Sequence, residues 1–307
     1  MAALAGMSWS FDKAQDHLWE FCRLRVSDDT IERVCQEEGI KIQKWMRQSP
    51  QPAQAFKAAA GQVEFSTDGV KINTVDGWRE MRISVWAKRQ ACLPCLPEQW
   101  DQRVLNEPTA RLAICAIAKS SLIGASWRRF NAILGLEDTA LSVLGDGAKW
   151  IWGESAQSFA SEAKWCLDIY HNSEHLHDCG KAILGPGAQA RAWADAYLHV
   201  VLAHNGPTLI DRLGQERATL APEKQAALDG LLGYLEDNRD SMWYCQRLQE
   251  GLPIGSGLIE GACKNTIGAR LKANSARWRV RRAERIGALR CLDYSDQWEA
   301  YWLSTAA

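Results

Sequence analysis

The chain has 307 residues, and none of its apolar runs approaches the roughly 20 residues that a bilayer-spanning helix needs. Its first residues, MAALAGMSWSF, lack the basic start of a secretory signal and soon reach Asp12 and Lys13. The sequence contains no internal repeat and no low-complexity tract. Net charge is almost absent, at −1. We therefore expect a cytoplasmic globular protein with no membrane partner and a sizeable hydrophobic core.

Paired cysteine motifs are also scarce. The ten cysteines lie mostly singly among apolar residues, which is typical of buried reduced thiols in a cytoplasmic protein. Cys92 and Cys95 form one CxxC motif, in ACLPCLP. A zinc site would need a second pair or nearby histidines, and no partner pair is suitably spaced. The sequence therefore does not favour zinc, although metal binding by Cys92 and Cys95 stays open.

The small net charge hides an uneven distribution. From Glu260 to Arg290 there are nine Lys or Arg residues and two acids, whereas from Lys181 to Glu250 there are seven basic and nine acidic residues. The first segment predicts a positive patch suited to nucleic-acid phosphates. Its candidate DNA-contacting residues are Lys264, Arg270, Lys272, Arg277, Trp278, Arg279 and Arg281. We include Trp278 because an aromatic ring among cations can contact a base or sugar, although it could equally be core.

Residues 1–58 are expected to be helical. One helix is indicated by apolar residues at helical spacing: Ala14, Leu18, Phe21 and Cys22. Ser27 can cap a second helix over residues 28–38 that ends at Gly39. The segment SPQPAQ (residues 49–54) is expected to be a linker.

Two short helices joined in this way resemble a helix-turn-helix, with Thr30 and Arg33 exposed on the second helix as candidate DNA contacts. The alternative is a helical hairpin that only packs on the remainder of the protein.

Strands are expected next. Residues 63–67 and 81–88 alternate apolar and polar side chains, and Asp76-Gly77 suits a hairpin turn between them. Residues 112–117 are continuously apolar, as in a central strand. Two further strands, at 141–144 and 163–169, follow, with a helix at 126–134 ahead of the first. From about 188 to 251 only helices are expected, and a closing helix carries Trp298 and Trp302.

Three carboxylates stand in distinctive settings. Asp68 ends the apolar-alternating run VEFSTDG, Asp146 ends the buried-looking run in LSVLGDGAKWIW, and Glu260 lies inside the start of a helix in LPIGSGLIEGACKN. The glycines permit sharp turns, so Asp68 and Asp146 could be simple turn residues. A Glu in the first turn is also favoured by the helix dipole. Carboxylates that converge from separate segments can instead hold two Mg²⁺ ions.

Further residues around these positions have two interpretations each. Ser256 is placed to cap the helix of Glu260. Lys264, one turn after Glu260, could form an ion pair with it or contact a phosphate. Trp150 and Trp152 could stack on bases but are more typical of core residues.

The motifs STDGVKIN, GWREMR, LGDGAKWIW, LDIYHNSEHL and GLPIGSGLIEGACKNTIGARLKANSARW occur in order over about residues 63–302. Together they resemble the ISKra-type family of bacterial insertion-sequence transposases, which are DDE transposases. The resemblance implies an RNase H-like α/β fold, a mixed sheet with helices on both faces. It divides the chain into a helical region (1–58), a first catalytic part (62–187), an all-helical insertion (188–251) and a second catalytic part with a basic C-terminal helix (252–307).

The resemblance also implies chemistry. Asp68, Asp146 and Glu260 would hold two Mg²⁺ or Mn²⁺ ions for DNA cleavage and strand transfer at the ends of an insertion sequence. His171, in a DxxH similar to motifs of Mutator-like transposases, would contact the scissile phosphate, or would only share a helix face with His175. The implied partners are double-stranded DNA, as terminal inverted repeats and target, and further copies of the chain as a dimer or higher oligomer. The implied location is the bacterial nucleoid.

Two alternatives remain. One is a nuclease of the same fold without strand transfer, and the other is a transposase-derived DNA-binding protein. Members of the family usually carry more sequence before the helical hairpin, so we expect part of the end-recognition apparatus to be absent here.

Overall fold

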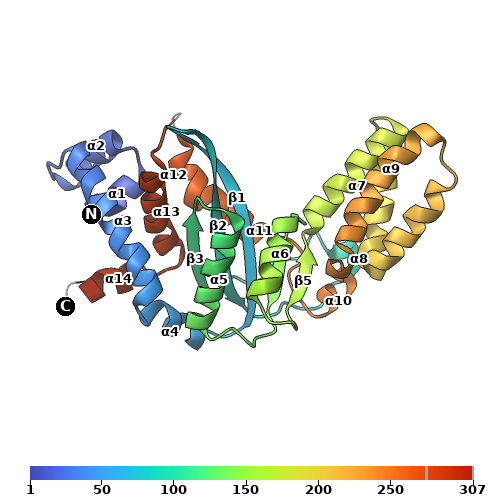
Figure 1. Ribbon diagram of the computed structural model, residues 1–307, viewed down its shortest axis with the longest axis horizontal. Helices are drawn as coiled ribbons and strands as arrows, with labels where there is room; N and C mark the ends of the chain where they lie inside the picture. The colour runs from blue at the N-terminus through green and yellow to red at the C-terminus, as the bar shows by residue number, and fades with distance from the viewer. Residues whose placement is uncertain (274–275, 306–307) are drawn as a thin grey trace.

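The computed structural model of the protein describes residues 1–273 and 276–305. The chain forms a mixed α/β fold around a five-stranded sheet with the order β3-β2-β1-β4-β5 (Figure 1). The strands are β1 (Gln62–Thr74), β2 (Gly77–Arg89), β3 (Ala110–Ala116), β4 (Ser142–Gly145) and β5 (Lys164–Leu167). The pairs β1–β2 and β2–β3 are antiparallel, and the pairs β1–β4 and β4–β5 are parallel. The expected mixed sheet is therefore confirmed.

The β1–β2 hairpin turns where the sequence predicts it. Thr74 pairs with Gly77, which has a φ of +91° that favours glycine. The expectation that the first strand stops at Asp68 is wrong, because Asp68 pairs with Ile83 and the ladder continues to Thr74. Pairing with a long partner strand overrides the local turn preference of Asp-Gly. Residues 70–81 project beyond β3 and β4. Strand β4 pairs only with residues 64–66 of β1, and β3 pairs only with residues 82–88 of β2. We call residues 70–81 the ribbon.

The apolar strand β3 lies at the edge of the sheet, so its expected central position is wrong. Its continuous apolar character has another cause, because α13 (Val280–Tyr294) packs along it. The Ala113 N–H donates to Ser295 Oγ (2.9 Å), and the Ile117 N–H donates to Glu284 Oε1 (3.0 Å). These side-chain partners satisfy backbone groups that an open edge would leave unpaired.

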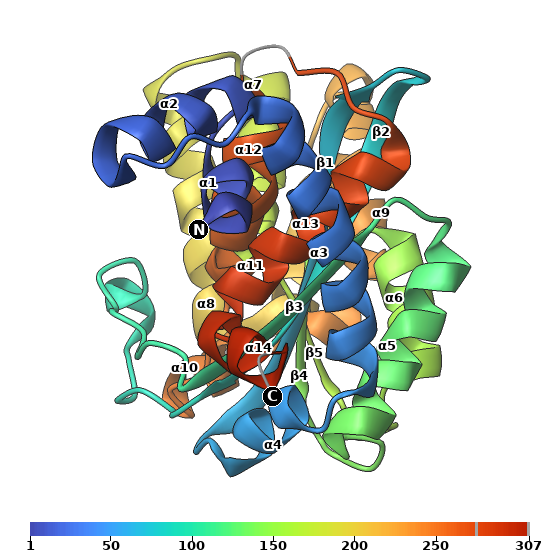
Figure 2. The same cartoon turned by 90° about the vertical axis from the view of Figure 1, so that its left-hand side faces the viewer.

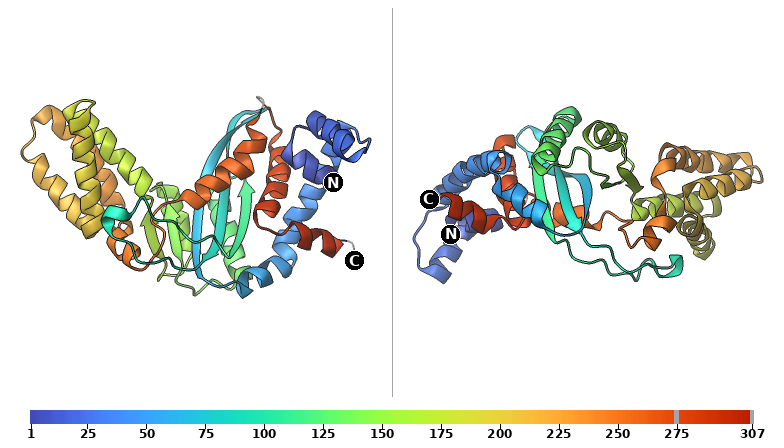
Figure 3. Two further views of the ribbon diagram at one scale, coloured as in Figure 1. Left: turned by 180° about the vertical axis from the view of Figure 1, so that it is seen from behind. Right: turned by 90° about the horizontal axis from the view of Figure 1, so that it is seen from below.

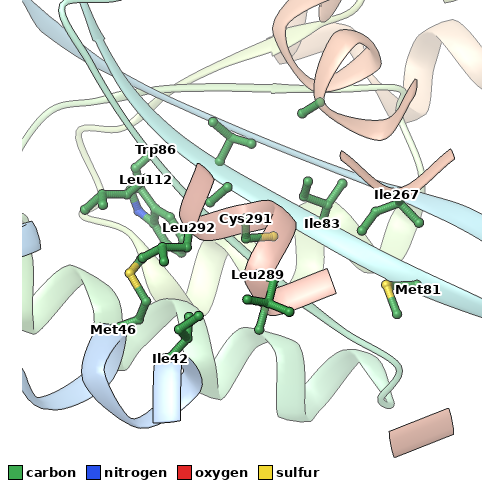
Figure 4. Close-up of a cluster of buried hydrophobic side chains, with 14 of the residues drawn as sticks. Ile42, Met46, Met81, Ile83, Trp86, Leu112, Ile267, Leu289, Cys291 and Leu292 are labelled. Atoms are coloured by element: carbon green, nitrogen blue, oxygen red, sulfur yellow. The ribbon is translucent and has the colours of Figure 1, made fainter. Parts of the chain in front are cut away.

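Helices cover both faces of the sheet. Alternate residues of β2 point to opposite sides. Trp86 points to α5 (Ser120–Leu134), where its indole N–H donates to Asn131 (2.9 Å). Met81 and Ile83 point to the other face, against α13 and the helical segments α11 (Gly257–Ala262), η3 (Cys263–Gly268) and α12 (Ala269–Leu271). Figure 4 shows this core, in which side chains of α3 and α13 meet the strands.

The N-terminal helices are α1 (Ala2–Ser8), α2 (Phe11–Cys22), α3 (Asp28–Gln48) and α4 (Gln51–Ala58). Ser27 caps α3 as expected, since its Oγ accepts from the Thr30 N–H at 3.3 Å. The expected end of this helix at Gly39 is wrong. A Cβ at Gly39 would lie 2.6 Å from Cβ of Arg285, so this glycine permits α3 and α13 to approach closely (Figure 2). The expected linker at 49–54 is also wrong, because α4 begins at Gln51 with proline in its first turn.

Residues 188–251 contain helices, as the sequence predicts. They are α8 (Ala188–Arg217), α9 (Pro222–Asp237), the short η2 (Arg239–Ser241) and α10 (Tyr244–Gln249). With α7 (Ile169–Leu184) they form a helical arm that rises opposite the ribbon (Figures 1 and 3). This arm packs around a second hydrophobic cluster, which includes Leu176, Val201 and Leu213 and extends to Leu144 of β4 and Leu167 of β5.

Three smaller helices remain among the residues that the structure describes. They are α6 (Lys149–Ser158), which packs beside α5, the short η1 (Pro97–Gln99) and the closing α14 (Trp298–Thr305). Within residues 1–273 and 276–305, no helix has the length and apolar character required to cross a membrane.

Candidate active site

Asp68 lies on β1, and Asp146 directly follows the neighbouring parallel strand β4 at the same height. Ser66 of β1 and Leu144 of β4 are register partners, and each aspartate lies two residues further in the same direction. Neighbouring strands are about 4.8 Å apart. The charge of Asp146 also acts on the carboxyl of Asp68. The structure therefore brings these two sequence-predicted residues together at one end of the strand pair.

The carboxyl group of Asp68 is largely enclosed. Burial raises its pKa above the usual value, and the charge of Asp146 raises that pKa further. The Gly69 N–H donates to Oδ1 (2.6 Å) and opposes this shift, as do the thiol of Cys263, with Sγ 3.8 Å from Oδ2, and the positive charge of His171. Two carboxylates in such surroundings favour a cation between or beside them.

Asp146 is held by the turn that the sequence predicts after β4. The Ala148 N–H donates to Asp146 Oδ1 at 2.9 Å. Gly147 has a φ of +90°, so the tight turn depends on glycine here. The hydroxyl of Tyr234, on α9, donates to the backbone carbonyl of Asp146 at 3.2 Å. The helical arm therefore helps to fix the position of this carboxylate.

Glu260 lies on α11, a helix that begins about 90 residues after the end of β5 but returns to pack against β1 and β2. Its side chain is exposed, and its Oε2 lies 3.4 Å from Nζ of Lys264. Cys263, on the next turn, contacts Asp68, and the charges of Asp68 and Glu260 both act on its thiol. Asp68 and Glu260 thus both act on Cys263, and the direct contact of Glu260 is the ion pair to Lys264.

Asp168 lies beside Asp68 and Asp146, and it is buried and accepts several hydrogen bonds. It follows β5, caps α7 by accepting from the Tyr170 N–H (2.8 Å), and accepts from the hydroxyl of Ser256. The expectation that Ser256 caps α11 with its side chain is wrong, because this hydroxyl is directed at Asp168 instead. Burial opposes ionisation of Asp168, but hydrogen bonds from His171, Ser256 and the Tyr170 N–H outweigh it and lower its pKa.

Asp168 holds the imidazole of His171 in place and keeps it protonated at neutral pH. Its Nδ1 lies 3.4 Å from Asp168 Oδ2. The hydrogen bond to Asp168 raises the pKa of His171 to about 9, with help from the charges of Asp146 and Glu174. His175 differs, because burial lowers its pKa and its ring stacks on Tyr234 at 3.9 Å. The two histidines therefore do not act alike, although both lie on α7.

The basic segment divides into buried and exposed members. Arg270 and Trp278 are only 5% and 7% exposed, so neither side chain is presented at the surface for the expected DNA contact. Arg270 donates to the carbonyl of Gly6, and Trp278 Nε1 donates to that of Leu271. Five other expected contacts of this segment have exposed side chains: Lys264, Lys272, Arg277, Arg279 and Arg281.

The two N-terminal candidates have local partners. Thr30 takes part in the cap of α3 through a hydrogen bond with Ser27 Oγ (2.9 Å), and Arg33 is exposed and pairs with Glu37 (3.1 Å). The helix that carries them packs along α13, which is the packing that the helical-hairpin alternative predicts.

The tryptophans that follow Asp146 are partly buried and already have partners. The guanidinium of Arg82 lies 4.0 Å from the ring centre of Trp150. Trp152 donates to Asn238 (2.7 Å) and packs edge-on against Trp165. These contacts support the interpretation of both residues as packing residues.

Cys92 and Cys95 carry free thiols, and the Asn106 N–H donates to Cys92 Sγ at 3.1 Å. Among the residues that the structure describes, no three His, Cys, Asp or Glu side chains are already gathered as a metal-binding group. The donor set at the candidate site nevertheless suits a hard divalent ion. Asp68 and Asp146 offer adjacent carboxylates, Glu260 is an exposed side chain one helical turn from Cys263, and oxygen donors of this type are those that Mg²⁺ prefers.

No model of a known protein family matches this chain, and no curated protein matches it.

Proposed function

We propose that the protein is a DDE-type DNA transposase with an RNase H-like catalytic domain interrupted by the helical segment 188–251. The observation that carries the proposal is the position of Asp68 and Asp146, two residues beyond the paired Ser66 and Leu144 on adjacent parallel strands. The strand order β3-β2-β1-β4-β5, with the first three strands antiparallel and the last two parallel to β1, supports the RNase H-like assignment.

Asp68, Asp146 and Glu260 would hold two Mg²⁺ or Mn²⁺ ions, which would supply Lewis-acid activation of the attacking oxygen and charge stabilisation of the leaving oxygen. The raised pKa of Asp68 supports this role. A bound cation would offset both the cost of burying the Asp68 carboxylate and its repulsion by Asp146. The exposed Glu260 can exchange its ion pair with Lys264 for another partner. Lys264 would then be free to contact a phosphate.

Asp168 and Ser256 would position His171 rather than touch the substrate. The imidazole, kept protonated at neutral pH by Asp168, would place a positive charge next to the phosphate that approaches Asp68 and Asp146. Lys272, Arg277, Arg279 and Arg281 would bind the DNA backbone further out. Strand transfer at two element ends would need at least two copies of the chain.

A nuclease of the same fold, without strand transfer, is the second candidate. One observation favours it. The helix with Thr30 and Arg33 packs along α13, and Arg282 of α13 pairs with Glu32. A helix held in this way is less free to read a DNA groove, so recognition of specific ends would depend on other surfaces.

The test is cleavage of DNA that carries the sequences flanking the gene. We expect cleavage with Mg²⁺ or Mn²⁺, none in EDTA, and joined products when target DNA is added. Cleavage without joining would support the nuclease. Full activity in EDTA would reject the metal-dependent mechanism for both.

A further inference from the structure

The turn that carries Asp146 is contacted by the C-terminal end of α9, in the helical arm. The Tyr234 hydroxyl donates to the Asp146 carbonyl at 3.2 Å. Asn238, which follows α9, lies against the next residue of the turn, because a Cβ on Gly147 would be 3.1 Å from Asn238 Oδ1. The arm therefore contacts this turn at two consecutive residues.

The side chain of Asn238 also connects the arm to α6. It is 2% exposed, its Oδ1 accepts from Trp152 Nε1 (2.7 Å), and its Nδ2 donates to the Tyr234 carbonyl (2.8 Å). An indole N–H can only donate and a carbonyl can only accept, so an amide satisfies both where a carboxylate satisfies only the indole. Because α6 begins at Lys149, just after the turn, Asn238 joins the segment that follows Asp146 to the arm.

A second helix of the arm fixes Tyr234. The ring of His175, on α7, stacks on the Tyr234 ring with centroids 3.9 Å apart and planes 30° apart. One turn earlier on α7 lies His171, which pairs with Asp168. The arm thus reaches the candidate site twice, through α7 at His171 and through α9 at Asp146, and the stacked rings join these two helices.

The base of the arm is bound separately to the strands that end at the candidate site. The buried side chain of Arg247, on α10, donates to Ser142 Oγ at the start of β4 (3.3 Å). The Tyr244 hydroxyl donates to the carbonyl of Leu167 at the end of β5 (2.9 Å). The arm is therefore anchored elsewhere, so a change in its contacts with the turn should free the turn and leave the arm in place.

We infer that Tyr234 and Asn238 are positioning residues for Asp146, and that the affinity of the candidate site for a divalent cation depends on them. The inference rests on the proposed function, and it adds that the helical segment 188–251 is a working part of the site. Neither side chain would touch the cation or the DNA. They would hold the turn where the carboxylates of Asp146 and Asp68 share a cation, as residues behind metal ligands commonly do.

The experiment measures Mn²⁺ binding to the full chain without DNA, from the free-ion signal in electron paramagnetic resonance. Tyr234→Phe removes one hydroxyl and keeps the ring that stacks on His175, and Asn238→Ala removes both amide hydrogen bonds. Tyr197→Phe is the matched control, because it removes a hydroxyl on α8 that donates to Glu216. Tyr234→Phe alone decides the outcome if Asn238→Ala does not fold.

We expect the dissociation constant for Mn²⁺ to rise about 10- to 100-fold in Asn238→Ala and about tenfold in Tyr234→Phe, the range found for residues that orient metal ligands. Tyr197→Phe should bind as the unchanged protein does. In single-turnover cleavage the first two variants should need more Mg²⁺ but approach the unchanged rate when Mg²⁺ saturates. A general loss of folding would lower the rate at every Mg²⁺ concentration.

A second readout needs neither metal nor DNA. The Nε1–H resonance of Trp152, assigned by NMR with Trp152→Phe, should exchange with solvent faster in Asn238→Ala, because its acceptor is removed. Its exchange should be unchanged in Tyr197→Phe. Circular dichroism shows whether each variant is folded.

Equal Mn²⁺ affinity in the unchanged protein, Tyr234→Phe and Asn238→Ala would overturn the inference and leave the proposed function intact. The same holds if Tyr197→Phe weakens binding as much as Tyr234→Phe, because the arm would then act only through its overall stability. If the unchanged protein binds no Mn²⁺, or if binding survives in both Asp68→Asn and Asp146→Asn, the proposed function is overturned and the inference with it.

Discussion

Nδ1 of His171 lies 3.4 Å from Oδ2 of Asp168, and Asp168 is itself buried and fixed by the hydroxyl of Ser256. This pairing turns an ordinary histidine into a cation beside the two carboxylates of the candidate site.

The pairing predicts a pH-dependent stability. The pKa of His171 rises from 6.5 to about 9 on folding, so its contribution is fully present below about pH 6.5 and is lost as the pH rises through 9. The melting temperature of the unchanged protein should therefore exceed that of His171→Gln most at pH 6.5 and least above pH 9. Thermal unfolding followed by circular dichroism measures this gap.

Substitution of Asp168, the hydrogen-bond partner of His171, tests the cause of the raised pKa. In Asp168→Asn the NMR-titrated pKa of His171 should fall toward its ordinary value, because the hydrogen bond to the charged carboxylate is its largest cause. A pKa that stays near 9 in this variant would show that Asp168 is not responsible.

Glu260→Gln should separate DNA binding from catalysis. The amide has nearly the same shape, and the side chain is exposed, so folding should be preserved. The loss of charge should weaken metal binding and reduce cleavage and strand transfer severely, with DNA affinity near normal. Single-turnover cleavage of a pre-bound DNA end is the measurement. A rate close to that of the unchanged protein would remove Glu260 from the site and make Asp168 the next candidate.

The exposed arginines of the basic segment should act through phosphates. Replacing Arg277, Arg279 and Arg281 by Ala should weaken binding to unrelated sequences alike and reduce the salt slope by about one unit for each lost contact. Arg239→Ala, at an exposed arginine of the helical arm paired with Glu236, is the matched control. An unchanged salt slope in the triple variant would mean that these arginines contact water and make no contact with DNA phosphates.

Gly39 should be intolerant of a side chain for a packing reason. A Cβ there would lie 2.7 Å from the carbonyl oxygen of Arg285, so Gly39→Ala must push α3 from α13 and should cost about 1–3 kcal/mol. Gly233→Ala, in an exposed helical position with nothing within 4 Å, should instead stabilise by about 0.5–1 kcal/mol. Urea unfolding of both variants tests the contrast, which equal effects would contradict.

Local patterns predicted the elements that depend on local sequence. The alternation of apolar and polar residues predicted the β1–β2 hairpin. Gly147 predicted the turn after Asp146, and Ser27 predicted the start of α3. Non-local contacts decided the rest. Pairing with β2 carries β1 through Asp68-Gly69, and contact with α13 carries α3 through Gly39.

The candidate site shows the same limit. The sequence indicated Asp68, Asp146 and Glu260, but no pattern in it shows that Ser256 donates to Asp168, because the two residues meet only in the folded chain. Nor does it show that Trp278 is buried and Trp78 exposed. That difference depends on which face of the ribbon meets α12 and α13.

The central claim is that Asp68 and Asp146 act together in metal-dependent DNA cleavage. The most direct measurement is single-turnover cleavage in Mg²⁺ by Asp68→Asn, Asp146→Asn and the double variant, with DNA affinity measured in parallel. We predict that each single change abolishes nearly all cleavage while DNA remains bound, and that the double variant is no worse than either, because the two carboxylates form one unit. Cleavage by either single variant at a rate near that of the unchanged protein would contradict the account.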